Sequence, residues 1–106
     1  MRVLFDQGTP VPLRRFLAGH AVRTAFEMGW SQLENGELLA AAEASFDVFV
    51  TTDQNLRHQQ NLAGRALAIL LPPTTSWPII ESYAAQVASA VAALQPGELR
   101  ELTFST

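Results

Sequence analysis

The chain has 106 residues, 48% of them hydrophobic and 16% charged, which predicts one globular domain over residues 1–106 with its own core. It has no cysteine, so disulfides and thiolate metal sites are excluded and a reducing, cytoplasmic setting is expected. The net charge of -3 argues against unspecific coating of duplex nucleic acid, although the basic residues are all arginines, which can hold a phosphate in a local cleft. The longest apolar run, 66–71, is too short to span a membrane.

The first predicted unit is a strand, a helix and a second strand. Residues 2–5 form a short apolar strand, which a proline-containing segment ends. Thr9 is the expected N-cap of a helix that buries Leu13 on its apolar face, and Gly19 is expected to end that helix. Residues 21–24 are the second strand, and this order over so short a segment implies a parallel crossover.

The second unit is a helix followed by the most strand-like segment of the chain. Asn35 is the expected N-cap of a helix whose buried side includes Leu38 and Phe46. The helix leads into a strand at 47–52, whose continuous apolar centre is typical of a strand buried on both faces. A polar, amide-rich segment follows, and we expect it to form a loop with one turn of helix.

Three further elements complete the predicted fold. Residues 66–71 are a fourth, fully buried strand that ends at two prolines. Ser76 is the expected N-cap of one long helix, with apolar residues recurring at steps of three or four. Residues 99–104 form an edge strand. The sequence therefore predicts an α/β fold with a four- or five-stranded, mainly parallel sheet flanked by helices.

An aspartate follows each of the two strands at 2–5 and 47–52. These are Asp6 and Asp53, and amide side chains come after both. Because the carboxyl ends of parallel strands meet at one edge of a sheet, we expect both carboxylates to border one cleft. Two such carboxylates need a cation between them, and oxygen ligands without cysteine or paired histidine favour Mg²⁺ or Mn²⁺. Glu37, at its helix start, is a candidate third ligand.

Four short motifs occur in a characteristic order. They are Leu4-Phe5-Asp6, Gly19-His20, Asn35-Gly36-Glu37-Leu38-Leu39 and Val50-Thr51-Thr52-Asp53-Gln54-Asn55. Over residues 2–71 this order and spacing resembles the short PIN-like family, which is related to VapC toxins. The resemblance implies a three-layer PIN-like sandwich and a cytoplasmic, metal-dependent endoribonuclease, often the toxin of a toxin–antitoxin pair. The implied partners are an RNA substrate, a cognate antitoxin protein and, in many relatives, a second copy of the chain.

The resemblance also assigns roles to individual residues. Asp6 matches the acid of the first strand and Asp53 the acid after the core strand. Together with Glu37 they would hold Mg²⁺ or Mn²⁺, and the ion would activate water against an RNA phosphodiester. Further polar candidates for the site or for contacts with an RNA strand are Asn35, Thr52, Gln54, Asn55 and Arg57.

Three other interpretations stay open. Asn35 and Asn55 stand where relatives commonly carry acids, which favours a PIN-like protein-interaction module without catalysis. A receiver-like domain, with acids that bind Mg²⁺ and one phosphorylated aspartate, is weaker because the chain has no lysine. The spacing alone equally fits aspartates that cap helices or accept backbone hydrogen bonds.

Overall fold

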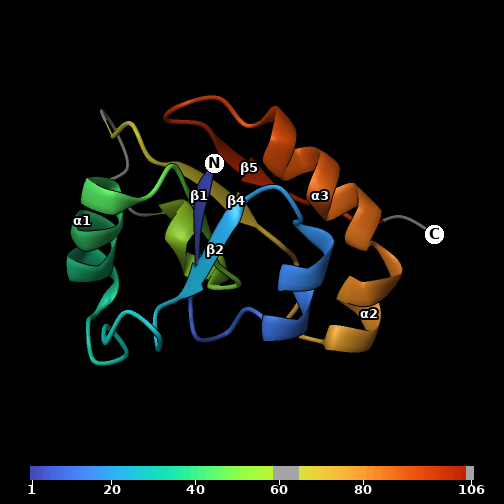
Figure 1. The fold of residues 1–106 in the computed structure, drawn as a ribbon, viewed down its shortest axis with the longest axis horizontal. Coiled ribbons are helices and arrows are strands. Elements are labelled where there is room, and N and C mark those ends of the chain that lie inside the picture. Colours follow the sequence, from blue (N-terminus) through green and yellow to red (C-terminus); the bar gives the residue numbers. More distant parts are fainter. Residues whose placement is uncertain (59–64, 105–106) are drawn as a thin grey trace.

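The fold is built on a five-stranded, all-parallel sheet in the order β2-β1-β3-β4-β5 (Figure 1). The computed structural model describes residues 1–58 and 65–104, without the side chains of Asn35, Arg57 and His58. The strands are Arg2–Phe5 (β1), Ala21–Thr24 (β2), Val48–Val50 (β3), Ala68–Leu71 (β4) and Leu99–Glu101 (β5). The predicted α/β class is confirmed, with five strands and a sheet that is parallel throughout.

Helices cover both faces of the sheet and give three layers (Figure 1). One face carries the 3₁₀ helix Val11–Phe16 (η1) and the helices Trp77–Ser82 (α2) and Ala84–Ala93 (α3). The other face carries Asn35–Ser45 (α1), and a 3₁₀ turn, Gln54–His58 (η2), follows β3. None of the helices in the described ranges is long and apolar enough to cross a membrane.

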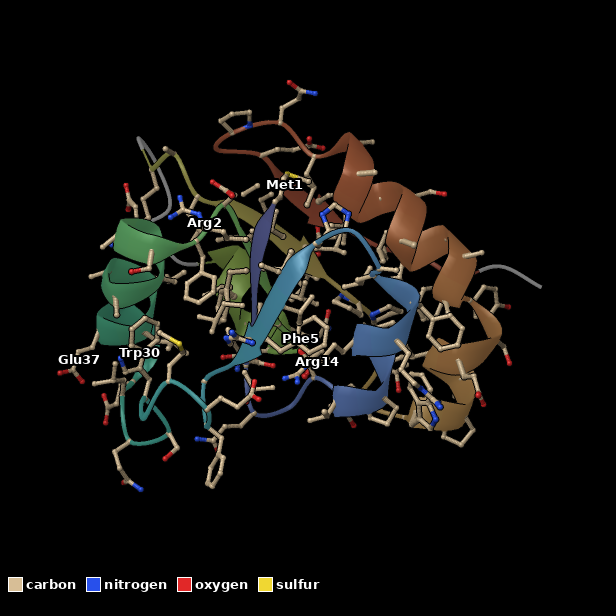
Figure 2. All side chains as sticks on the ribbon, in the orientation of Figure 1. Met1, Arg2, Phe5, Arg14, Trp30 and Glu37 are labelled. Carbon is tan, nitrogen blue, oxygen red and sulfur yellow. The ribbon has the colours of Figure 1, made fainter. Side chains whose placement is uncertain are left out.

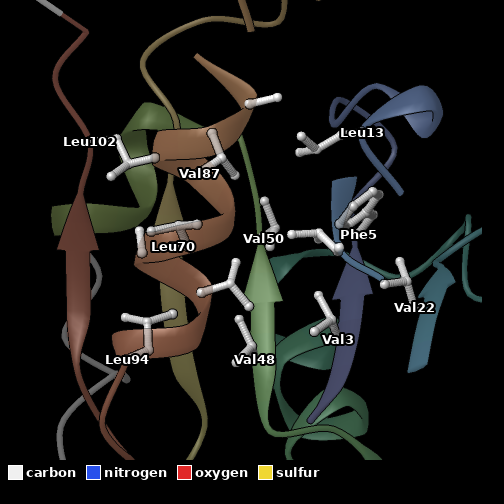
Figure 3. Close-up of a cluster of buried hydrophobic side chains, with 14 of the residues drawn as sticks. Val3, Phe5, Leu13, Val22, Val48, Val50, Leu70, Val87, Leu94 and Leu102 are labelled. Carbon is white, nitrogen blue, oxygen red and sulfur yellow. The ribbon is translucent and has the colours of Figure 1, made fainter. Parts of the chain in front are cut away.

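Alternate residues of the central strands pack on opposite faces, as the continuous apolar runs predict. Phe5 and Val50 point toward η1 and α3, where they meet Leu13 and Val87 (Figure 3). Leu4, Phe49 and Ile69 point to the other face, where they meet the buried side of α1. Phe5 is fully buried, which contributes about 1.5–3 kcal/mol relative to an exposed ring.

The helix starts differ from those predicted. Thr9 does not cap η1, because its hydroxyl is bonded to Asp6 instead, and η1 begins after Pro10 as a 3₁₀ helix. The N-cap of α1 is Glu34 rather than Asn35. At η1 no side chain caps the helix, whereas at α1 the capping box between Glu34 and Glu37 fixes the start one residue earlier than predicted.

The predicted single long C-terminal helix is two helices. Tyr83 separates α2 from α3 with φ −115° and ψ 18°, and its ring stacks on Phe104 at 4.4 Å between centroids. The Ser82 hydroxyl donates to the Pro78 carbonyl at 3.1 Å, a bond within the helix that favours bending. Ser76 is the N-cap position of α2, as predicted, but makes no side-chain capping bond.

Candidate functional site

The order of the strands reverses between β1 and β3. The chain leaves β1 toward β2 on one side of this point and leaves β3 toward β4 on the other side. In open α/β sheets such a switch point opens a crevice at the carboxyl ends of the strands, where ligands bind. Phe5 pairs with Val50 in the sheet, so Asp6 and Thr51 leave the two strands side by side.

Two buried hydroxyls hold the carboxylate of Asp6. Thr9 Oγ1 donates to Oδ1 at 2.6 Å, and Thr51 Oγ1 donates to Oδ2. Both threonines are only 2% exposed. The backbone N–H of Asp6 donates to the Val50 carbonyl at 3.1 Å, so backbone and side chain are both fixed to β3. A carboxylate can accept about four hydrogen bonds, which leaves acceptor capacity for a further ligand.

Thr51 connects the two predicted aspartates. Its hydroxyl donates to Asp6 and accepts the backbone N–H of Asp53 at 3.2 Å. Asp53 Oδ1 accepts the backbone N–H of Asn55 at 3.0 Å, and the Asp53 carbonyl accepts that of Leu56 at 3.0 Å. Asp53 therefore stabilises the start of η2, and its backbone N–H bonds to the same Thr51 hydroxyl that donates to the carboxylate of Asp6.

Gly8 lies against Thr52 in the same place. A Cβ atom at Gly8 would be 2.5 Å from Thr52 Oγ1 and 3.8 and 3.9 Å from the carboxylate oxygens of Asp6. Gly8 does not have a positive φ, so close approach and not a turn requires the glycine. The sequence analysis did not identify Gly8, although its position two residues after a strand-end aspartate was a signal.

The polar residues after Asp53 have structural partners. Gln54 Nε2 donates to the Thr52 carbonyl at 3.2 Å and to the Pro72 carbonyl at 2.7 Å, which joins η2 to the segment after β4. Asn55 is exposed. The side chain of Arg57 falls outside the described part of the structure. Thr52 and Gln54 therefore lie at the site, where Gln54 bonds to the segment after β3 and to the segment after β4.

Glu37 lies in the first turn of α1. Its Oε1 accepts the backbone N–H of Glu34 at 3.4 Å, in a capping box. Figure 2 shows Glu37 on the outer side of α1, directed away from the strand end at Phe5. Across residues 1–58 and 65–104, no three acidic or histidine side chains gather closely enough to hold a metal ion. The structure therefore does not bring Glu37 to Asp6 and Asp53; the side chain of Asn35 is outside the described part.

Two hollows open beside the loop that carries Asp6 and Gln7, and both residues line each of them. One measures about 230 Å³ and is also lined by Thr9, Val11, Thr24 and Phe26. The other measures about 270 Å³ and is also lined by Gly8, Ala25, Trp30, Ser31, Leu33 and Leu38. Asp6 and Gln7 are thus shared by two neighbouring spaces at the carboxyl end of β1.

A network of polar contacts fixes the turn at the rim of the smaller hollow. Arg14 Nη2 donates to Glu27 Oε1, which also accepts the Thr24 backbone N–H at 2.9 Å. The Glu27 backbone N–H donates in return to Thr24 Oγ1 at 3.1 Å. The Arg14 hydrogen bond, followed by the Thr24 bond, lowers the pKa of the Glu27 carboxyl below its usual value.

The donor atoms at the switch point fit a hard divalent cation. Asp6 and Asp53 offer carboxylates, and Thr51 and Thr52 offer hydroxyls, with no sulfur or imidazole nearby in the motif. Mg²⁺ is commonly held by only one or two carboxylates, with water and substrate phosphate oxygens as its other ligands.

Comparisons with known proteins found no protein-family model, curated protein or solved structure that matches this chain.

Proposed function

We propose that this protein is a PIN-like, Mg²⁺- or Mn²⁺-dependent endoribonuclease, the toxin of a toxin–antitoxin pair. The observation that supports this most is the Asp6 carboxylate, held by Thr9 and Thr51 at the switch point beside Asp53. Asp6 also lines two hollows, so there is space beside this residue for a phosphate group.

Each residue of the site would have a separate role in the proposed reaction. Thr9 and Thr51 orient the Asp6 carboxylate, so that it meets a cation without rearrangement. Thr51 also holds the backbone of Asp53, which fixes the second acid relative to the first. Gly8 allows the loop that carries Asp6 to approach Thr52 closely. Asp6 and Asp53 would hold the ion, which when bound would polarise a phosphoryl oxygen and activate a water for in-line attack.

The antitoxin is the proposed protein partner. Ile79 is 48% exposed on α2 and Phe16 is 40% exposed on η1, where its ring packs 6.0 Å from Trp77. These apolar side chains favour a protein contact near the C-terminal helices. A homodimer through the same surface is the competing proposal, and the molar mass in solution of the protein alone would decide between them.

Cleavage of single-stranded RNA by purified protein tests the proposed activity. Cleavage is expected with Mn²⁺ and not with EDTA, and it should disappear in Asp6→Asn and in Asp53→Asn. Asp47→Asn is the matched control, because Asp47 precedes β3 at the opposite end of the sheet and bonds to Arg2. Glu37→Gln should keep most of the activity. Cleavage that survives in the Asp6 and Asp53 variants would contradict the proposal.

The protein-interaction module is the second candidate. It is favoured by the structural partners of the acids, since Asp53 caps η2 and Glu37 belongs to the capping box of α1. Calorimetry with Mn²⁺ separates the two candidates. Binding that Asp6→Asn abolishes supports the nuclease, and absence of binding together with absence of cleavage supports the module.

A further inference from the structure

One aromatic side chain is strongly exposed beside the candidate site. Phe26 is 78% exposed, more than the other large hydrophobic side chains in the described part of the chain. It lines the smaller hollow, together with Val11, which is 53% exposed. The same hollow is bordered by Asp6. An exposed aromatic residue and the proposed metal-binding Asp6 thus line the same hollow.

The backbone that carries Phe26 is held firmly. The reciprocal bonds between Thr24 and Glu27 enclose it, and Arg14 ties Glu27 to η1. The N–H of Met28 donates to the Thr24 carbonyl at 3.1 Å. An aromatic ring on a fixed turn loses little conformational entropy when a ligand packs on it, which is the property of a binding platform.

Gln7 adds a polar edge to the hollow. Its Nε2 donates to the Ser31 carbonyl at 2.6 Å, which orients the amide. Within the described ranges its Oε1 has no hydrogen-bond partner, and the side chain is exposed. A ring face beside an oriented amide is the combination that proteins use for unpaired bases, by stacking and by hydrogen bonds to the base edge.

We propose that Phe26 is a stacking platform for an unpaired base of single-stranded RNA, next to the phosphate that lies at Asp6. This inference rests on the proposed nuclease function, because it places the backbone of the RNA at the carboxylate. The negative net charge means that contacts independent of charge would have to supply much of the affinity for RNA. With a net charge of -3, the protein attracts a polyanion weakly, whereas a base stacks on an aromatic ring without regard to charge.

Fluorescence anisotropy with a labelled, short single-stranded RNA tests the inference. The Asp6→Asn protein in Mg²⁺ serves as the background, so that cleavage does not interfere. Adding Phe26→Ala should weaken binding roughly 5- to 150-fold, the usual range for loss of one base stacked on an aromatic ring. Phe26→Trp should retain binding, and Phe26→Leu should lose it, because leucine keeps apolar surface but has no π-face. Ile79→Ala, another exposed apolar residue outside the hollow, should have no effect.

A series of RNAs with a single abasic position completes the test. Removing the base that stacks on Phe26 should weaken binding to the background protein and leave binding to the Phe26→Ala protein unchanged, as expected for two groups that interact. Equal losses in both proteins, or equal binding of Phe26→Ala and its background, would overturn the inference. If the stacking inference is overturned but the parent protein still cleaves RNA, the proposed nuclease function stands without the stacking role of Phe26. No RNA binding and no cleavage would overturn both.

Discussion

Gly8→Ala should destabilise the protein because of the close approach of Gly8 to Thr52. The new Cβ atom would lie 2.5 Å from Thr52 Oγ1, a separation that real Cβ contacts do not show. Threonine is branched at Cβ, so only one of its staggered χ1 rotamers removes the heavy atom from that position. Either Thr52 adopts that rotamer, or the loop after β1 or the segment after β3 moves.

The size of the effect follows from overpacking. Adding a methyl group to a filled space costs about 1–3 kcal/mol of the free energy of unfolding. For a domain of this size each kcal/mol lowers Tm by roughly 4–8 °C. Urea denaturation followed by the fluorescence of Trp30 and Trp77 measures the loss, and a thermal melt gives the shift in Tm.

A second substitution isolates the cause. Thr52→Ala removes the hydroxyl that the new Cβ would meet, and this hydroxyl makes no hydrogen bond in the described part of the chain. The Gly8→Ala/Thr52→Ala double variant should therefore recover most of the stability that Gly8→Ala loses. Gly36→Ala is the control, because a Cβ there meets no atom within 4 Å, and alanine in α1 should be neutral or stabilising. If Gly8→Ala is as stable as the parent, or the double variant shows no recovery, the close contact is not what requires a glycine at this position.

Three further predictions follow from single contacts. Because Arg14 lowers the pKa of Glu27, their contact contributes stability that is complete above the usual pKa of 4.5 and is lost as the pH falls below that value. Arg14→Gln should therefore flatten the dependence of stability on pH in this acid range and raise the Glu27 pKa measured by NMR. An unchanged Glu27 pKa would refute the contact. Gly97→Ala should cost about 1–2 kcal/mol or more in urea denaturation, since φ is +78° and the new Cβ would lie 2.8 Å from a backbone carbonyl oxygen; full stability would contradict this backbone conformation. Thr51→Val should cost about 1–3 kcal/mol by removing the donor to Asp6, with Thr51→Ser as the control that restores it.

Much of the fold could be predicted because the central strands are buried on both faces. The apolar runs at β1 and β3 are short, continuous and bounded by polar residues, so the pattern alone located them. The segment between β2 and α1 has no such period, and it was the least predictable part of the chain. Its turns, which contain Gly29 with φ +76°, set where α1 begins and hence where Glu37 lies.

The site could be predicted only in part, since its contacts join residues far apart in sequence. The hydroxyl of Thr51 bonds to a carboxylate 45 residues away, and Gly8 meets Thr52 just beyond the paired ends of β1 and β3. Sequence patterns indicated which side chains end each strand, but not which hydroxyls would hold Asp6. The exposure of Phe26 had no signal either, because an isolated aromatic residue in an irregular segment is more often buried.

The position of β1 in the sheet has a consequence for how the chain folds. β1 lies between β2 and β3 in the sheet. Its pairing with β2 joins residues close in sequence, whereas its pairing with β3 closes a longer loop, to residues that begin at Val48. Until then Val3, Leu4 and Phe5, all fully buried in the folded protein, present an uncovered apolar edge. Such an edge is a template for pairing with another chain, and closing the longer loop is slow. Refolding should therefore compete with aggregation, and the yield of folded protein should fall as the protein concentration rises. The strand at which aggregation would start, β1, is the one that positions Asp6.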